Sequence, residues 1–250
     1  MRQKPRSART ITQAARLRRG IFSMGVNNSW TVHRPTLWTC VDSPDRFVDV
    51  GWKDPGITKI VPVEHWNSRL RVALGEGRFR QSQFRVADMP GVLMYRRSDT
   101  FDHRSFLRAD TISWGCATSA TDSLGIKGKR SVMLAALGLL HYLGFRSVYL
   151  LGADFRMATD RKYAFDENRS AQSIRHNNVL YDSLDRRFHA LLPEFRKAGF
   201  EVLNCCQDSG LTAFPKIGFD EAVERASAEC SKPVPTDGWY EPAKEKKPCP

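Results

Sequence analysis

A buried helix–strand unit near the middle of the chain constrains the fold more than any other feature. Residues 132–143 form an almost uninterrupted apolar run, and Gly144 directly follows it. A helix that is apolar nearly all round has to be buried, and glycine is typical of the position after a helix end. The short apolar segment 147–151 then leads into Gly-Ala-Asp-Phe, residues 152–155. Strand ends of this kind bind ligands in α/β proteins, so we expect Asp154 to lie at a ligand site.

Short β-forming runs alternate with helical patterns along the rest of the chain. The predicted strands are 21–26, 36–41, 59–63, 91–95, 147–151 and 201–205, and the predicted helices are 10–19, 132–143, 177–198 and 219–230. This alternation is typical of a parallel sheet covered on both faces. We therefore expect an α/β fold of the Rossmann-like, three-layer kind with a mostly parallel sheet.

Two stretches do not fit this alternation. Residues 64–90 are rich in Arg and only weakly periodic, and residues 96–128 are irregular. An irregular stretch of about 30 residues is uncommon in a compact domain, so we expect a small lid or insertion within 64–128, with 96–128 as the lid. The tail 231–250 holds five Pro and four Lys with few apolar residues and is expected to be disordered. Residues 1–230 are predicted to form a single domain.

The net charge of +12 comes from two segments. Residues 1–20 carry seven Lys or Arg and no acid, and residues 69–108 carry nine Arg and four acids. Basic patches favour phosphate-rich partners, whether nucleotides or nucleic acid. Nucleic-acid binding through 69–108 and a merely solvated surface both stay open, because no known nucleic-acid-binding motif accompanies the charge.

The sequence gives little support for a metal site or a membrane segment. None of the six cysteines forms a C-x-x-C pair, so no zinc site is indicated. No apolar run reaches the roughly 18 residues that a membrane span needs. No apolar run of the signal-peptide type follows the basic N-terminus. We therefore expect a cytoplasmic protein without a protein-bound metal.

Several polar residues stand where a ligand site would form. Asn27 and Asp42 each end a predicted strand, where side chains either face the ligand crevice or make ordinary turns. Ser131 follows a glycine-rich basic turn, and it either helps to bind an anion at the helix start or simply caps the helix. His176 stands in a polar segment before the long helix and could act as a general base.

An ordered set of motifs over residues 128–218 resembles a known family. The motifs are Leu143-Gly-Phe145, the segment 148–155, Tyr163-Ala-Phe-Asp166, His176 followed by Asp182-Ser-Leu184, the segment 204–209, and Phe214-Pro215. Their order and spacing resemble those of the bacterial lipooligosaccharide sialyltransferase family. They also resemble the wider Rossmann-like group of methylpterin pyrophosphokinase-like proteins, many of them phage-encoded. The resemblance implies the cytoplasm of a bacterium or of a phage-infected cell.

The resemblance implies roles for individual residues. Tyr163 would bind the phosphate of a nucleotide-activated donor, His176 would be the general base on an acceptor hydroxyl, and Asn27 would contact the donor. Arg156 stands where the family has a second phosphate-binding Tyr, and a guanidinium can neutralise phosphate bidentately. No cofactor is then required, whereas Mg²⁺ would be expected for pyrophosphoryl transfer in the wider group.

The N-terminus departs from the family pattern. The family opens with a strand that leads into Gly-x-Gly-Pro-Ser, and here only Pro5-Arg6-Ser7 stands at that distance before Asn27. Ser7 would be the donor-binding remnant, and the first strand is either lost or encoded upstream of Met1. The favoured hypothesis is a sialyltransferase-like glycosyltransferase. The alternatives are a pyrophosphokinase-like or nucleic-acid-modifying enzyme, and a non-catalytic protein that kept the fold.

Overall fold

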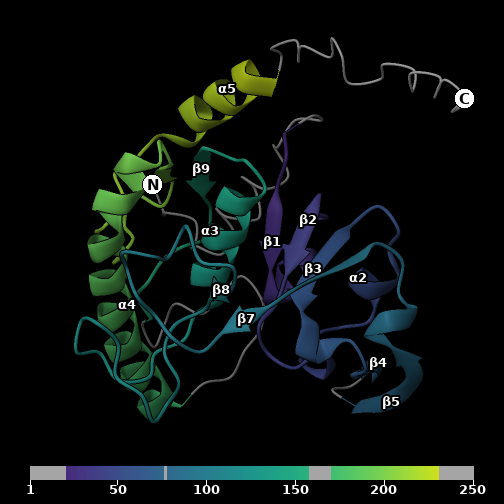
Figure 1. Ribbon diagram of the computed structural model, residues 1–250. Coiled ribbons are helices and arrows are strands. Elements are labelled where there is room, and N and C mark those ends of the chain that lie inside the picture. The colour runs from purple at the N-terminus through teal and green to yellow at the C-terminus, as the bar shows by residue number, and fades with distance from the viewer. Residues whose placement is uncertain (1–20, 76–77, 158–169, 231–250) are drawn as a thin grey trace, which may run out of the picture.

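The computed structural model describes residues 21–75, 78–157 and 170–230, and they form an α/β structure (Figure 1). The strands are β1 (Met24–Val26), β2 (Leu37–Thr39), β3 (Thr58–Pro62), β4 (Arg69–Gly75), β5 (Arg78–Arg85), β6 (Val92–Tyr95), β7 (Arg97–Ser98), β8 (Ile112–Ser113), β9 (Ser147–Leu150) and β10 (Glu201–Asn204). The helices are α2 (Val50–Lys53), α3 (Val132–Tyr142), α4 (Ala171–Lys197) and α5 (Phe219–Cys230). Short 3-10 turns are η1 (Asn27–Thr31), η2 (Pro44–Arg46), η3 (Val63–His65) and η4 (Val86–Asp88). The predicted helix at 10–19 and the predicted tail at 231–250 lie outside the described residues.

Parallel pairing dominates the sheets. The main sheet has the order β1-β2-β3-β6, and each neighbouring pair in it is parallel. Strands β9 and β10 form a second parallel pair, whereas β4 and β5 form an antiparallel ribbon. The prediction of a Rossmann-like α/β fold with a mostly parallel sheet is therefore confirmed.

The two parallel groups stay separate within the described residues. There β1 is hydrogen-bonded only to β2, and β9 only to β10. The chain just before these two strands comes close, because the rings of Phe22 and Phe145 lie 5.7 Å apart. Helix α3 also contacts β1. The loss of a first strand stays a prediction.

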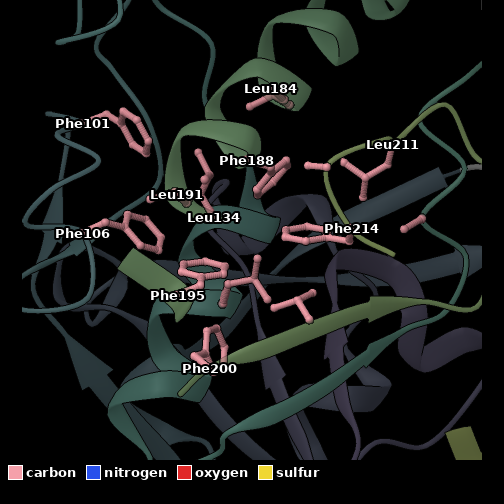
Figure 2. Close-up of a cluster of buried hydrophobic side chains, with 14 residues drawn as sticks. Phe101, Phe106, Leu134, Leu184, Phe188, Leu191, Phe195, Phe200, Leu211 and Phe214 are labelled. Carbon is pink, nitrogen blue, oxygen red and sulfur yellow. The ribbon is translucent and has the colours of Figure 1, made fainter. Parts of the chain in front are cut away.

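The larger hydrophobic core lies between α3, α4 and the β9–β10 pair (Figure 2). Helix α4 buries one stripe of side chains at helical spacing, namely Leu184, Phe188, Leu191 and Phe195. These pack against aromatic residues from distant segments, among them Phe200 and Phe214, at ring distances of 5.0 to 6.4 Å. In α3, residues 134–139 are all buried. The apolar run that constrained the fold in sequence is thus a core helix, as predicted.

A second core supports the main sheet with stacked tryptophans. The rings of Trp30 and Trp38 stack 4.0 Å apart, and Trp52 meets Trp38 edge-on at 5.0 Å. Gly51 is required here, because an added Cβ would lie 2.1 Å from the Trp30 ring. The Trp38 Nε1–H also donates to the backbone oxygen of Asn27 at 2.7 Å. This core therefore fixes the backbone that follows β1.

Helix α4 begins earlier than the predicted start at residue 177. Its first residue is Ala171, and the Ser170 side chain caps it by accepting a hydrogen bond from the Ser173 amide at 3.2 Å. The first two turns are polar, so their apolar periodicity could not reveal a helix. The expectation that His176 precedes the helix is wrong, since His176 lies within it.

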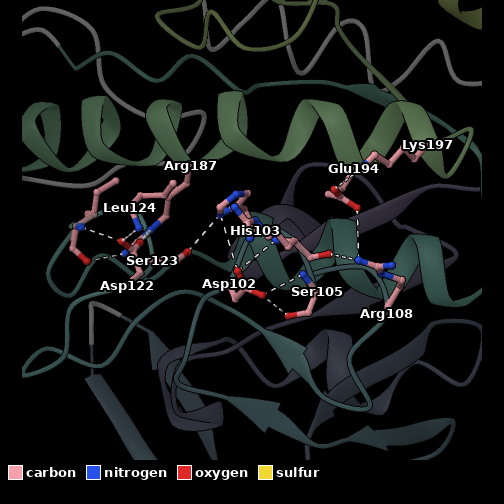
Figure 3. A network of polar contacts seen from close by, with 12 residues as sticks. Asp102, His103, Ser105, Arg108, Asp122, Ser123, Leu124, Arg187, Glu194 and Lys197 are labelled. Carbon is pink, nitrogen blue, oxygen red and sulfur yellow. Dashed lines mark hydrogen bonds and ion pairs between the residues drawn. The ribbon is translucent and has the colours of Figure 1, made fainter.

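Residues 64–90 and 96–128 are also more regular than expected. The first stretch contains the β4–β5 ribbon, and the second contains β7, β8 and tight turns. A fully buried side chain, Arg187 of α4, binds the second stretch (Figure 3). It donates to Asp122 Oδ2 at 2.6 Å and to the backbone oxygens of Gly128 at 2.8 Å, Ile126 at 3.2 Å, and Lys129. That this stretch acts as a lid stays a prediction.

Replacing Arg187 by Met should lower the free energy of unfolding by about 3–5 kcal/mol, because Asp122 would remain buried without its partner. The control is Arg186→Met, an exposed arginine on the same helix, which should change stability by less than about 0.5 kcal/mol. Urea denaturation measures both. A loss of less than about 1 kcal/mol for Arg187→Met would contradict the proposed role of this contact.

Candidate functional site

Three consecutive polar residues follow the carboxyl end of β1. Asn27 adopts a left-handed backbone conformation with φ of 51°, which asparagine tolerates better than most residues. The buried side-chain oxygens Asn27 Oδ1, Asn28 Oδ1 and Ser29 Oγ have no hydrogen-bond partner among the described residues. The predicted placement of Asn27 at a strand end is confirmed, and its buried oxygen adds an observation that sequence could not supply.

The neighbouring strands end in two more buried hydroxyl groups. Thr39, the last residue of β2, is fully buried, and its Oγ1 is unpartnered within the described part of the chain. The hydroxyl of Tyr95, the last residue of β6, likewise makes no hydrogen bond of normal geometry among the described residues. Burial raises the pKa of the Tyr95 phenol above its usual value, and the nearby Thr39 hydroxyl offsets part of this rise, so the two hydroxyl groups lie close to each other without a hydrogen bond of normal geometry. Both groups are therefore neutral hydrogen-bonding groups at physiological pH.

Buried polar atoms without partners concentrate at the carboxyl edge of the parallel strands. Besides those atoms, Asn204 Nδ2 at the end of β10 is unpartnered among the described residues, as are Arg130 Nε and two indole nitrogens of the tryptophan core. Leaving such an atom unpaired costs about 1–3 kcal/mol. Ligands of open α/β sheets bind outside the carboxyl ends of the strands. We therefore take the carboxyl edge, where these unpaired atoms lie, as the candidate site.

Two arginines close to this edge were missed by sequence reasoning. Arg97 follows β6 and donates to the backbone oxygen of Val41, just beyond β2, at 2.7 Å. Its guanidinium carbon lies 4.3 Å from the centre of the Trp114 ring, and that of Arg130 lies 4.7 Å from the same ring. Asp99 pairs with Arg130 at 3.3 Å. Glu64 also lies 3.9 Å from Arg97, so the two guanidinium groups give this part of the edge planar donor groups whose charge is largely balanced by carboxylates.

Residues beyond β2 and β3 complete this part of the edge. Asp42 is half-exposed and lies 3.4 Å from Arg46, in an ordinary surface ion pair. The His65 ring nitrogen Nε2 lies 3.3 Å from the Val41 backbone oxygen, and burial lowers the pKa of His65. His65 is therefore neutral at physiological pH. Asp42 lies at the predicted strand end, but its contacts fit a turn residue as well as a ligand-binding one.

The loop after β9 is held rigidly. Phe155 has a left-handed φ of 47° and packs on Tyr181 and Phe188 of α4 at ring distances of 5.0 and 5.9 Å. The Gly210 amide donates to the Asp154 backbone oxygen at 2.8 Å. An added Cβ on Gly210 would lie 2.5 Å from the Phe155 oxygen, so only glycine fits there. Asp154, half-buried in this loop, therefore keeps a fixed position at the strand end.

Asn178 joins this loop to the first turns of α4. Its side-chain amide donates to the Met157 backbone oxygen at 3.1 Å, and its Oδ1 accepts from the Met157 amide at 2.9 Å. Arg156, which is exposed, precedes Met157. His176 is also exposed and lines a shallow depression with Gln172, Ser173 and Asn177. The structure thus brings the segments of Arg156 and His176 together.

The remaining predicted site residues separate into two groups. Tyr163 and Ser7 lie outside the described residues. Ser131 caps α3, because its Oγ accepts a hydrogen bond from the Met133 amide at 3.2 Å. Capping was one of its two predicted roles, and a contact of Ser131 with a donor stays a prediction.

Buried thiols beside the β9 loop are poor nucleophiles. Burial raises the pKa of Cys205 to about 12, and it also raises the pKa of Cys206, which lies near the negative charge of Asp154. The thiolate is the reactive form of cysteine. Neither residue is therefore poised for covalent catalysis at neutral pH.

Within ranges 21–75, 78–157 and 170–230, no group of three or more His, Cys, Asp or Glu is placed to hold a metal ion. In the same ranges no helix combines the length and apolar character that crossing a bilayer requires. Comparison of the chain with protein-family models, curated proteins and solved structures finds no match.

The unpartnered hydroxyl at the end of β2 can be tested by an isosteric change. Thr39→Val should leave the free energy of unfolding unchanged or raise it by about 1 kcal/mol, because the hydroxyl that it removes lies near the Tyr95 hydroxyl but makes no hydrogen bond of normal geometry among the described residues. Ser113→Ala is the matched control, since the buried Ser113 hydroxyl donates to Thr100 at 2.5 Å. That change should cost about 1 kcal/mol. Equal losses in urea denaturation would show that Thr39 does have a partner in the apo protein.

Proposed function

We propose that the chain is a transferase that binds a nucleotide-activated donor at the carboxyl edge of the parallel sheet. The observation that carries the proposal is the set of buried polar atoms of Asn27, Asn28, Thr39 and Tyr95 that make no hydrogen bond to any residue that the structure describes. A ligand rich in hydroxyl and amide groups would supply the missing hydrogen bonds and remove the cost of leaving them unmade. A nucleotide with a sugar attached has this chemistry.

The charges at the edge suit the phosphates of such a donor. Arg97 and Arg130 each lie over the Trp114 ring and are paired with Glu64 and Asp99, and guanidinium groups favour phosphate oxygens, which would replace these surface carboxylates. We assign Asn27, Asp42 and Asp154 to the hydroxyl and base groups of the donor. Ser131 remains a donor contact because it follows a glycine-rich basic turn at a helix start, and Ser7 remains one on the strength of the family resemblance alone.

The proposed reaction is displacement at the donor carbon that carries the phosphate. An acceptor hydroxyl oxygen attacks this carbon, the bond to the phosphate oxygen breaks, and its electron pair leaves with the phosphate. The hydroxyl proton passes to His176 acting as general base. Arg156 and Tyr163 stabilise the charge that develops on the leaving phosphate. The resemblance favours a sialyltransferase-like glycosyltransferase among the enzymes that use this chemistry.

A second candidate is a pyrophosphokinase-like or nucleic-acid-modifying enzyme on the same fold. The nine arginines of residues 69–108 favour it, because such a segment attracts a polyanion. Pyrophosphoryl transfer would require Mg²⁺, so dependence of turnover on Mg²⁺ separates the two candidates. A non-catalytic member of the fold that has lost the nucleotide cradle would bind no nucleotide at all.

Nucleotide binding tests the site directly. A panel of nucleoside mono- and diphosphates and nucleotide sugars should contain a ligand that raises the melting temperature of the wild type. Asn27→Gly tolerates the left-handed backbone and removes the buried amide, so this variant should lose most of that ligand-induced shift. Asn67→Gly, at an exposed turn, is the control and should keep it. Absence of any ligand from the panel, or an unchanged shift in Asn27→Gly, would count against the site.

The catalytic assignment has its own test. With the donor found in the panel, His176→Ala should lower kcat by about 10²–10⁴-fold, as expected for loss of a general base, while the nucleotide-induced melting shift stays as in the wild type. His189→Ala removes another exposed histidine from the same helix and should keep kcat within about twofold. Unchanged turnover in His176→Ala rules this residue out as the base.

A further inference from the structure

The β4–β5 ribbon, residues 69–75 and 78–85, presents a basic and aromatic face, and we propose that this face binds single-stranded nucleic acid. The two strands contain five Arg and no acidic residue. Two neighbouring parallel strands are usually connected by a crossover helix. Here the connection between the parallel strands β3 and β6 contains the ribbon instead. In Figure 1 it lies on the side of the molecule opposite α4.

The ribbon has an inner and an outer face. Leu70 and Ser82 are buried, and Leu70 belongs to the tryptophan core. Directly paired residues of antiparallel strands share a face, and the register pairs Arg69 with Arg85 and Arg71 with Gln81. The outer face therefore carries Arg69, Arg71, Phe79, Gln81 and Arg85. This face points away from the tryptophan core, which Leu70 joins from the inner face.

An aromatic ring stacked with a guanidinium stands on this outer face. Phe79 is 45% exposed, and the Arg71 guanidinium carbon lies 3.9 Å from the centre of its ring. Exposed aromatic and guanidinium planes are the surfaces on which unpaired bases stack. Bases inside a duplex already stack on their neighbours, so this face favours a single strand.

The arginines of the outer face are available to pair with phosphate groups. Among the described residues, no carboxylate pairs with Arg69, Arg71 or Arg85. Unpaired arginines that neutralise phosphates release counterions, and this makes binding strong at low salt and weak at high salt. The pattern of stacking planes between free cations is that of a sequence-tolerant single-strand binder.

The base of the ribbon leads toward the carboxyl edge. Strand β4 follows η3 beyond the end of β3. The ladder of hydrogen bonds continues below the ribbon, from the Val86 amide to Ser68 at 3.0 Å and from the Ala87 amide to Trp66 at 3.0 Å. Trp66 is 37% exposed. A strand bound along the ribbon can therefore extend to the candidate site, although its binding does not depend on the proposed transferase function.

Fluorescence anisotropy with a labelled oligothymidine of about 15 nucleotides, within the range that single-strand sites occupy, tests the proposal in the full chain. Phe79→Ala should weaken binding about tenfold, and Phe79→Tyr should restore it. The pair Arg71→Gln and Arg85→Gln should reduce the slope of log Kd against log salt by about 1.4. The matched pair Arg186→Gln and Arg196→Gln removes two exposed arginines from α4 and should bind within about twofold of the wild type.

Three results would overturn the proposal. One is wild-type affinity in both ribbon variants, with urea midpoints showing that they fold. Another is a duplex of the same length that binds as tightly as the single strand. The third is displacement of the oligonucleotide by polyglutamate as effective as displacement by unlabelled oligonucleotide, because a generic polyanion surface would show no advantage from stacking. A failure of the nucleotide panel would leave these results unaffected.

Discussion

The buried guanidinium of Arg187 is the contact on which the arrangement around the sheet depends. It joins α4 to Asp122 and to three backbone oxygens of the loop 126–129, and this loop leads to Ser131 and the start of α3. A charge taken out of water is tolerated only when nearly all its donors are satisfied, so this joint accepts few alternative geometries. The same segment carries Trp114 and Arg130 to the carboxyl edge. A structural ion pair thus positions residues of the candidate site without belonging to it.

The two ends of the main sheet differ in how their buried polar groups are satisfied. Near the amino end Lys59 is fully buried, and its ammonium donates to the backbone oxygens of Asp54 at 2.6 Å and Pro90 at 2.7 Å. Near the carboxyl end Asn27 and Thr39 keep buried oxygens without a partner in the described residues. The fold supplies hydrogen-bond acceptors to a buried lysine, so it could equally have supplied a partner to a buried amide oxygen. The contrast favours a ligand-binding role for the carboxyl end.

Sequence patterns revealed the elements whose signal is local. The apolar run of α3, the short β-forming runs and the stripe on α4 each follow from burial of one face or of the whole element. The β4–β5 ribbon was not predicted because its exposed face carries Arg and Gln, so the two strands lack a clear alternation of apolar and polar residues. The first turns of α4 were not predicted because they are polar. Arg97 and Arg130 could not be joined from sequence, since only the tertiary fold brings them to one tryptophan ring.

Hydrogen–deuterium exchange with and without the best nucleotide of the panel measures whether a donor binds at the carboxyl edge. We expect slower exchange in peptides that cover residues 24–31, 39–42, 95–99 and 152–157, because hydrogen bonds to a ligand would hold these strand ends closed. Exchange in α5 should not change. Protection confined to segments away from the strand ends, or no protection by any nucleotide, would contradict the account.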